Sequence, residues 1–122
     1  MSTTTFETLA ASRYVSLTTF RRDGSPVATA VWVARDGDAL VVVTGAGSGK
    51  VRRIRANGAV TLAPCDVRGR VHGDAVSGRA VVLDASETKR VTRAIRRRYG
   101  LVGWLFSRGS DDDRVGLSIT IG

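Results

Sequence analysis

The sequence predicts a mainly β domain, in which a six-stranded antiparallel barrel carries two or three helices on its outside. Six short apolar segments bounded by Gly, Pro, Asp or Asn predict the strands. The predicted helices do not alternate with these strands, which argues against a parallel sheet. A chain of 122 residues is long enough for one hydrophobic core, so we expect a single domain over residues 1–122.

Alternation of side chains and turn residues set the strand boundaries. The six predicted strands span residues 14–22, 26–33, 39–44, 59–65, 75–83 and 115–121. Asp36-Gly37, between two apolar runs, predicts a tight hairpin turn before the third strand. Gly78 lies inside the fifth strand, where a glycine predicts a bulge or a bend.

The second and third strands are apolar on both faces. Val31 and Val33 lie on one face of the second strand, and Ala30 and Trp32 lie on the other. An antiparallel strand of this kind needs a cover on both sides, of which one is the barrel core. Because the chain offers few helices, we expect the second cover to be a ligand ring or a partner subunit.

Three segments predict helices. Phe6 and Leu9 favour a short helix within residues 1–13, and Ser48 and Asn57 are the predicted N-cap and end of a second helix. The third is predicted to begin after an N-cap at Ser86 and to end at Gly100. Its predicted buried face consists of Val91, Ala94, Ile95 and Tyr99. An apolar segment over 101–106 and a polar loop over 107–113 precede the last strand.

The link between the third strand and the second helix has the chemistry of a phosphate site. Three glycines in GAGSG allow the backbone to approach a ligand closely. The helix then begins at its N-cap Ser48 and carries Lys50, Arg52, Arg53 and Arg55. Because free amides and the helix dipole already favour anions at a helix N-terminus, we interpret this segment as a phosphate-binding loop. Val51 and Ile54 are expected to point into the core.

Charge and composition limit the classes of protein to consider. A net charge of +8 suggests an anionic partner, and a second basic cluster lies at Lys89–Arg98. Nucleic acid fits the charge alone, but the strands show few aromatic residues for stacking bases, so we expect no nucleic-acid partner. No apolar run reaches membrane-spanning length and no signal peptide is recognisable. With one cysteine, Cys65, no internal disulfide is possible, and we expect a cytoplasmic protein without membrane contact.

Several catalytic motifs are excluded by spacing. Gly45 leaves three residues before Gly49-Lys50, where a nucleotide-triphosphatase loop needs four, and Val51 stands where that loop needs Ser or Thr. One His and one Cys do not make a zinc site, so we expect no metal. His72 is expected to be an exposed surface side chain and Cys65 a buried one, neither of them catalytic. A phosphate site without hydrolytic residues favours a protein that holds a phosphorylated cofactor.

The order of these segments carries a resemblance. The stretches VSLTTFRRDGSPVATAVWV and TGAGSGKVRRIRANGAVTLAPCD, with SGRA in a later strand, resemble the pyridoxamine-phosphate-oxidase-like split β-barrel superfamily. Within it, they are most similar to the actinobacterial flavin and deazaflavin oxidoreductases that depend on F420. The resemblance implies a split barrel and a homodimer with a cofactor in each groove between the subunits.

The resemblance also implies a set of cofactor-binding residues. Thr29, Ala30 and Val31 would lie beside the flavin or deazaflavin ring, and Thr44, Ser48 and Lys50 match the family's phosphate-binding pattern. Gly49 stands where the oxidases often have an arginine, and Arg52 or Arg53 would compensate from the next turn. The implied cofactor-binding residues are Thr29, Ala30, Val31, Val43, Thr44, Ser48, Gly49, Lys50 and Arg53.

The expected function follows from this cofactor. F420 carries a phosphate and a polyglutamate tail, which suits the basic helix better than the single phosphate of flavin mononucleotide (FMN). We therefore expect an F420-dependent oxidoreductase that transfers hydride between reduced F420 and a small organic substrate. Val31, Trp32 and Trp104 suggest an apolar pocket for that substrate, and no catalytic residue is identified. An FMN-dependent enzyme of the same fold and a non-catalytic F420 carrier remain alternatives.

Overall fold

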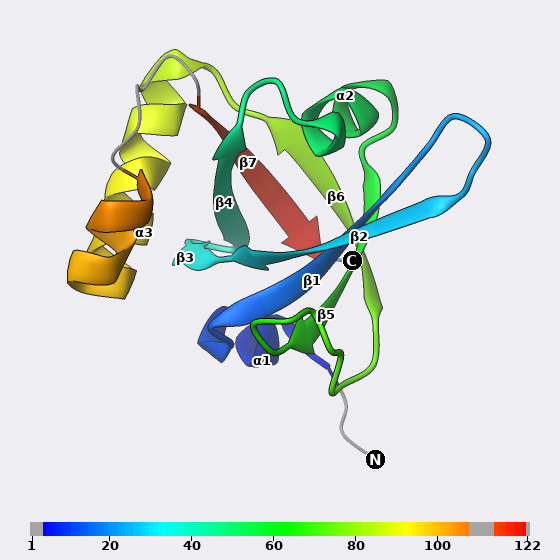
Figure 1. The fold of residues 1–122 in the computed structure, drawn as a ribbon, viewed down its shortest axis with the longest axis horizontal. Helices are drawn as coiled ribbons and strands as arrows, with labels where there is room; N and C mark the ends of the chain where they lie inside the picture. The colour runs from blue at the N-terminus through cyan, green and yellow to red at the C-terminus, as the bar shows by residue number, and fades with distance from the viewer. Residues whose placement is uncertain (1–3, 108–113, 122) are drawn as a thin grey trace.

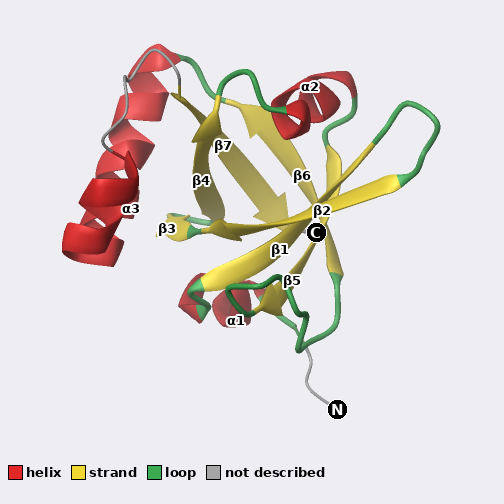
Figure 2. Ribbon diagram, in the orientation of Figure 1, coloured by secondary structure: helices red, strands yellow, loops and turns green. Residues whose placement is uncertain are grey.

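The computed structural model describes residues 4–107 and 114–121 (Figure 1). The helices are α1 (Phe6–Ala11), α2 (Gly49–Ala56) and α3 (Ala85–Ser107). The strands are β1 (Tyr14–Phe20), β2 (Pro26–Trp32), β3 (Ala34–Asp36), β4 (Ala39–Gly45), β5 (Ala59–Cys65), β6 (Val76–Val82) and β7 (Arg114–Ile121). The chain is thus mostly β with a few helices, as predicted, and the helices lie on the outside of the sheet (Figure 2).

The strands form one antiparallel sheet in the order β2-β1-β5-β6-β7-β4-β3. Its two edge strands, β2 and β3, are consecutive in the chain and are separated only by Val33. The sheet therefore curls until its two edges meet at Val33, which makes a split barrel, as the resemblance implied (Figure 1).

The described residues form seven strands rather than the predicted six, because a short strand, β3, follows a break at Val33, where the second predicted strand ends. Residues before Val33 pair with β1 at one edge of the sheet, and those after it pair with β4 at the other. The Val33 carbonyl instead accepts a hydrogen bond from Arg98 of α3, and the Tyr99 hydroxyl of the same helix lies 2.7 Å from it. The following turn is also shifted by one residue. Asp36 pairs with Ala39, so the turn residues are Gly37 and Asp38, with Gly37 at a φ of 60°.

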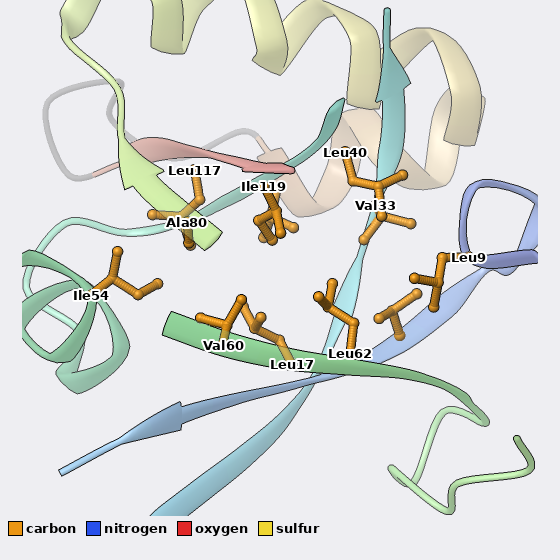
Figure 3. Close-up of a cluster of buried hydrophobic side chains, with 12 residues drawn as sticks. Leu9, Leu17, Val33, Leu40, Ile54, Val60, Leu62, Ala80, Leu117 and Ile119 are labelled. Atoms are coloured by element: carbon orange, nitrogen blue, oxygen red, sulfur yellow. The ribbon is translucent and has the colours of Figure 1, made fainter. Parts of the chain in front are cut away.

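Side chains from all parts of the curled sheet fill the barrel core (Figure 3). The buried cluster includes Leu9, Leu17, Val33, Leu40, Ile54, Val60, Leu62, Ala80, Leu117 and Ile119. Ile54 closes one end of the barrel from α2 and Leu9 contributes from α1. Val51 is also fully buried, so both predicted inward residues of α2 are confirmed. Burying this much apolar surface is the main stabilisation that a β domain of this size has available.

Helix α3 covers the outer face of β4, which corrects the expectation that a ligand or partner would cover it. Val91, Ile95 and Tyr99 form a second buried cluster with Ala34 and Val41. Gly116 of β7 permits this close packing, since a Cβ there would lie 2.6 Å from Val91 Cγ2. On β2 the outcome differs: Pro26, Ala28 and Ala30 are exposed in the described structure, so that strand remains without a cover on one side.

Three local predictions need correction. The N-cap of α3 is Asp84 rather than Ser86, because Asp84 Oδ1 accepts a hydrogen bond from the Glu87 amide at 2.9 Å. Gly100, with a φ of 61°, breaks the helix as predicted, but the backbone is helical again up to Ser107. Gly78 makes no bulge, since the β5–β6 register runs through it without interruption. Most of the predicted polar loop, residues 108–113, lies outside the described residues, as does the side chain of Trp104.

Candidate cofactor-binding site

A cavity of about 350 Å³ lies at the seam of the split barrel, between β2, β4 and α3. This volume is at the lower end of the range for small-molecule sites. Its lining residues are Tyr14, Ala30, Val31, Trp32, Val43, Thr44, Lys50, Val67, Thr92, Ile95 and Arg114.

The seam exists because two strands have backbone edges that are free of sheet partners. β2 is an edge strand that pairs only with β1. β4 pairs with β3 over residues 39–41, so its edge beyond Val41 faces the seam without a β3 partner. Val31 from the first edge and Val43 from the second both line the cavity. A flat ring held here meets apolar side chains and has backbone donors and acceptors at its rim.

One end of the cavity reaches the N-terminus of α2. Lys50 Nζ donates a hydrogen bond to Thr44 Oγ1 at 3.0 Å, and both residues border the cavity. Ser48 is the N-cap of α2, but its side chain makes no capping hydrogen bond. Its hydroxyl oxygen is buried and has no hydrogen-bond partner among the described residues. A buried hydroxyl without a partner is costly, so this oxygen is a site at which an added acceptor would stabilise the protein.

Arg53 brings a second cation to the same helix end. Its Nε donates to Thr19 Oγ1 of β1 at 2.6 Å, which fixes the guanidinium group. A Cβ at Gly49 would lie 2.6 Å from Arg53 Nη1. The glycine therefore leaves the space that the guanidinium group fills, beside the first amides of α2. The first amides of a helix have no acceptor within the helix, so cations and amides converge here on a position suited to an anion.

Electrostatics at this end disfavours an empty site. Burial lowers the pKa of Lys50 below its ordinary value, and the charge of Arg53 lowers it further. Among the described residues, no carboxylate or histidine lines the cavity to offset these charges. A bound phosphate would replace the missing counter-charge.

The cavity also has an aromatic wall, to which Tyr14 and Trp32 contribute. The Trp32 ring stacks on Tyr99 with centroids 4.5 Å apart and an interplanar angle of 13°. Tyr14, on the neighbouring strand, is tilted against Trp32 at 6.3 Å. The Tyr99 hydroxyl lies 2.7 Å from the Val33 carbonyl oxygen, so the stack is anchored to the β2–β3 junction. Burial raises the pKa of Tyr99, which keeps this hydroxyl a hydrogen-bond donor.

A groove of about 440 Å³ adjoins the basic end and is lined by Phe20, Arg21, Arg22, Arg52, Arg53, Ala56 and Asn57. Arg53 belongs to both regions, because its guanidinium group also lies beside Gly49. By contrast, the second basic cluster is partly structural. Arg90 pairs with Asp36 at 2.7 Å, and Arg98 donates to the Val33 carbonyl at 2.9 Å.

The structure brings the candidate residues together in two adjoining groups. Ala30, Val31, Val43, Thr44 and Lys50 line the cavity, whereas Ser48, Gly49 and Arg53 form the helix end beside it. Thr29 is half-buried on β2 and does not border the cavity. Sequence reasoning missed Tyr14, Val67, Thr92, Ile95 and Arg114. Of these residues, only Tyr14 could have been predicted from the sequence, since the register of the first hairpin places it opposite Trp32.

Neither Cys65 nor His72 borders the cavity. Cys65 is buried and His72 is exposed, as predicted. No group of three or more potential ligands among the described residues could hold a metal ion. No helix in residues 4–107 has the length and hydropathy needed to cross a membrane.

A curled antiparallel sheet with a seam that opens beside a basic helix N-terminus defines this protein as a split barrel of the pyridoxamine-phosphate-oxidase type. The family model for pyridoxamine 5'-phosphate oxidase matches residues 2–122, and the chain belongs to that family. None of the curated protein sequences matches the chain significantly.

Solved structures agree with this assignment. An F420 reductase is 28% identical with a TM-score of 0.69, over 99% of this chain and 96% of the other. A FAD-binding protein from Mesorhizobium loti is 20% identical with a TM-score of 0.70, over 95% and 86% of the two chains. A heme storage protein from Vibrio cholerae is 13% identical with a TM-score of 0.72, also over 95% and 86%. The last two show a shared fold only.

Proposed function

We propose that this protein is an F420-dependent oxidoreductase, which transfers hydride between reduced F420 and a small organic substrate. One observation carries the proposal: the seam cavity borders Lys50 at the start of α2, where, among the described residues, the buried Ser48 hydroxyl has no hydrogen-bond partner and no carboxylate lines the cavity. The residues present therefore fit a molecule that combines a flat ring with a phosphate. When bound, the deazaflavin ring supplies the hydride.

The protein itself would bind the cofactor, orient its ring and exclude water from it. Val31 and Val43 would pack on the two sides of the ring edge, where the free edges of β2 and β4 offer backbone hydrogen bonds. Ser48 Oγ, Lys50 Nζ and the first amides of α2 would hold the phosphate, with Arg53 at its flank. Fixing the phosphate positions the ring, because the two are parts of one molecule.

The arginine-lined groove favours F420 over FMN. FMN ends at its phosphate, whereas F420 continues into a chain of carboxylates. The groove is lined by Arg21, Arg22 and Arg52 together with Arg53, which also lies beside Gly49 at the phosphate site. Arginine–carboxylate pairs would offset four neighbouring positive charges that otherwise repel one another. The 28% identical F420 reductase supports the same choice.

Two alternatives each have an observation in their favour. An FMN-dependent enzyme of the same fold would use the same phosphate site, and a FAD-binding protein shares this fold. A non-catalytic F420 carrier is favoured by the cavity lining, which among the described residues includes no carboxylate or histidine to donate a proton.

We also propose that the protein is a homodimer with a small-molecule substrate and cofactor at the subunit interface. The exposed residues of β2, Pro26, Ala28 and Ala30, form an apolar edge next to the cavity. A second copy that packs against this edge would cover it and would close the seam over the ring.

Side-by-side equilibrium titrations with F420 and FMN test the proposed function. The protein is expected to bind F420 more tightly than FMN, and Lys50→Ala is expected to weaken F420 binding by about tenfold or more. Oxidation of reduced F420 by any member of a panel of acceptors then separates the enzyme from the carrier. Tighter binding of FMN would contradict the cofactor assignment, and F420 affinity unaffected by Lys50→Ala would contradict the phosphate site.

A further inference from the structure

Thr19 is a polar residue on the apolar side of β1, and the proposed function gives it no role. It follows Val15 and Leu17 on the core-facing side of the strand, and both of those side chains are fully buried. Thr19 itself is only 1% exposed. A buried hydroxyl costs free energy unless it is hydrogen-bonded, and a valine of nearly the same shape would avoid that cost. The hydroxyl group of Thr19 therefore has a purpose other than packing.

That hydroxyl group is bonded to a cation of α2. Arg53 Nε donates to Thr19 Oγ1 at 2.6 Å, which joins the end of β1 to the helix that follows β4. Among the described residues, the Arg53 side chain has no other hydrogen-bond acceptor and no carboxylate partner. The contact with Thr19 thus fixes Nε and leaves both terminal nitrogens of the guanidinium group available to a ligand.

With Nε held by β1, the rest of the guanidinium group lies between two anion-binding regions. Nη1 fills the space beside Gly49, where a Cβ would lie 2.6 Å from it. The same side chain lines the groove that also contains Arg21, Arg22 and Arg52. Because a guanidinium group is a planar fork of donors, one arginine can bind two neighbouring anionic oxygens. Arg53 is therefore placed to contact a phosphate at α2 and an acidic group in the groove.

We infer that Thr19 is a positioning residue, which holds Arg53 between the phosphate site and the groove and so favours cofactors whose phosphate continues into an acidic tail. This inference rests on the proposed function, which puts a phosphate beside Ser48 and Lys50. FMN ends at its phosphate, whereas F420 continues from its phosphate into carboxylates, so only F420 can use both sides of a fixed guanidinium group. Without the Thr19 hydroxyl, Arg53 keeps its charge but must be ordered when the ligand binds.

Equilibrium titrations with three ligands that share one deazaflavin ring test this inference. They are the deazaflavin riboside without phosphate, F420 stripped of its glutamates, and F420 with its full tail. Thr19→Val is the test variant, Thr19→Ser keeps a hydroxyl group, and Thr120→Val, at an exposed position of β7, is the control for an added valine. Arg53→Met, alone and combined with Thr19→Val, shows whether Thr19 acts through Arg53.

Thr19→Val should weaken binding of F420 with its full tail about fivefold, because one hydrogen bond to a charged group is lost. Binding of F420 without glutamates should weaken less, and binding of the riboside should not change. Thr19→Ser and Thr120→Val should bind all three ligands like the wild type. Arg53→Met alone should show the same dependence on the ligand, and Thr19→Val should add no further loss in its background.

Three results would overturn the inference. These are equal weakening of all three ligands by Thr19→Val, an additional loss when Thr19→Val is combined with Arg53→Met, and F420 binding by Thr19→Val that equals the wild type. The first two would make Thr19 a structural residue of the barrel. Should Thr19→Val fail to fold, riboside and F420 affinities that fall equally in Arg53→Met would overturn the inference as well. A wild-type protein that binds none of the ligands would contradict the proposed function and the inference together, whereas F420 binding that needs Lys50 but not Thr19 would contradict the inference alone.

Discussion

Lys50 is the residue at which stability and function oppose each other. Its pKa is lowered by burial and by Arg53, so its charged form is less favourable in the folded, ligand-free protein than in the unfolded chain. This loss of folding free energy is fully present at neutral pH, and it is relieved only as pH rises towards the ordinary lysine range.

Lys50→Met should therefore raise the melting temperature of the ligand-free protein and lower its F420 affinity by about tenfold or more. Calorimetric melting and an F420 titration of the same sample measure the two effects. A variant that is both less stable and unchanged in affinity would show that Lys50 is an ordinary structural lysine.

The pH dependence of cofactor binding provides a second test of the role of Lys50 at the phosphate. A bound phosphate favours charged Lys50, so affinity should be constant near neutral pH and should fall as the free protein loses this proton. Because the pKa is lowered, the fall should begin below the ordinary lysine value. Titrations between about pH 7 and about pH 10 measure it, and Lys50→Met should remove the fall from the profile.

Two glycines of the same loop give a matched pair for the anion site. A Cβ at Gly49 would meet Arg53 Nη1 at 2.6 Å, whereas a Cβ at Gly47 would meet nothing within 4 Å. Gly49→Ala should displace the guanidinium group and weaken F420 binding severalfold, without loss of fold, since alanine favours the helix. Gly47→Ala should bind F420 like the wild type. Equal affinities of the two variants in parallel titrations would exclude a role for Arg53 at the phosphate.

At the scale of elements, hydrogen bonds connect α3 to the junction between β2 and β3. The Tyr99 hydroxyl lies 2.7 Å from the Val33 carbonyl and 2.9 Å from the Arg13 carbonyl, and it donates to one of them. Arg98 donates to the Val33 carbonyl as well. These bonds replace the ladder hydrogen bond that the strand break removes, and they hold the aromatic wall of the cavity.

Tyr99→Phe should destabilise the protein by about 1 kcal/mol, since it removes one buried hydrogen bond at the β2–β3 junction. Urea unfolding measures this loss, with Arg97→Gln on the exposed side of the same helix as the control. A Tyr99→Phe protein as stable as the control would show that Arg98 alone satisfies the junction.

The sequence predicted elements well where the pattern is local. The buried positions of α2 and α3 followed from helical spacing, and the strands followed from alternation and turn residues. Prediction from the sequence failed where contacts between distant parts of the chain determine the local structure. Asp84 takes the cap instead of Ser86 because the chain enters the helix two residues earlier. Val33 breaks the strand because the curled sheet needs it at both edges, and the missing side chain of Gly116 on β7 lets α3 approach closely enough to cover β4.

At the scale of the whole molecule, the cavity was only partly predictable. The phosphate end lies in one continuous segment, where glycines, a cap residue and cations follow one another, so sequence order was sufficient. Val67, Thr92 and Arg114 reach the cavity from three separate parts of the chain. No local pattern marks such residues, because the curl of the sheet alone brings them together.

The proposed dimer is a prediction at this same scale. Ala28→Glu places a charge on the exposed edge of β2 and should shift the protein from dimer to monomer in sedimentation experiments, with weaker F420 binding. Ser77→Glu, at an exposed position of β6, is the control for added charge. A wild-type protein that sediments as a monomer at micromolar concentration would contradict the proposed interface.

The most direct test of the account is a crystal structure of the protein with F420. We predict that the ring lies in the seam between β2 and β4, and that the phosphate lies within hydrogen-bond distance of Ser48 Oγ and Lys50 Nζ. A structure in which F420 lies elsewhere, while the Ser48 hydroxyl remains buried without a partner, would contradict it.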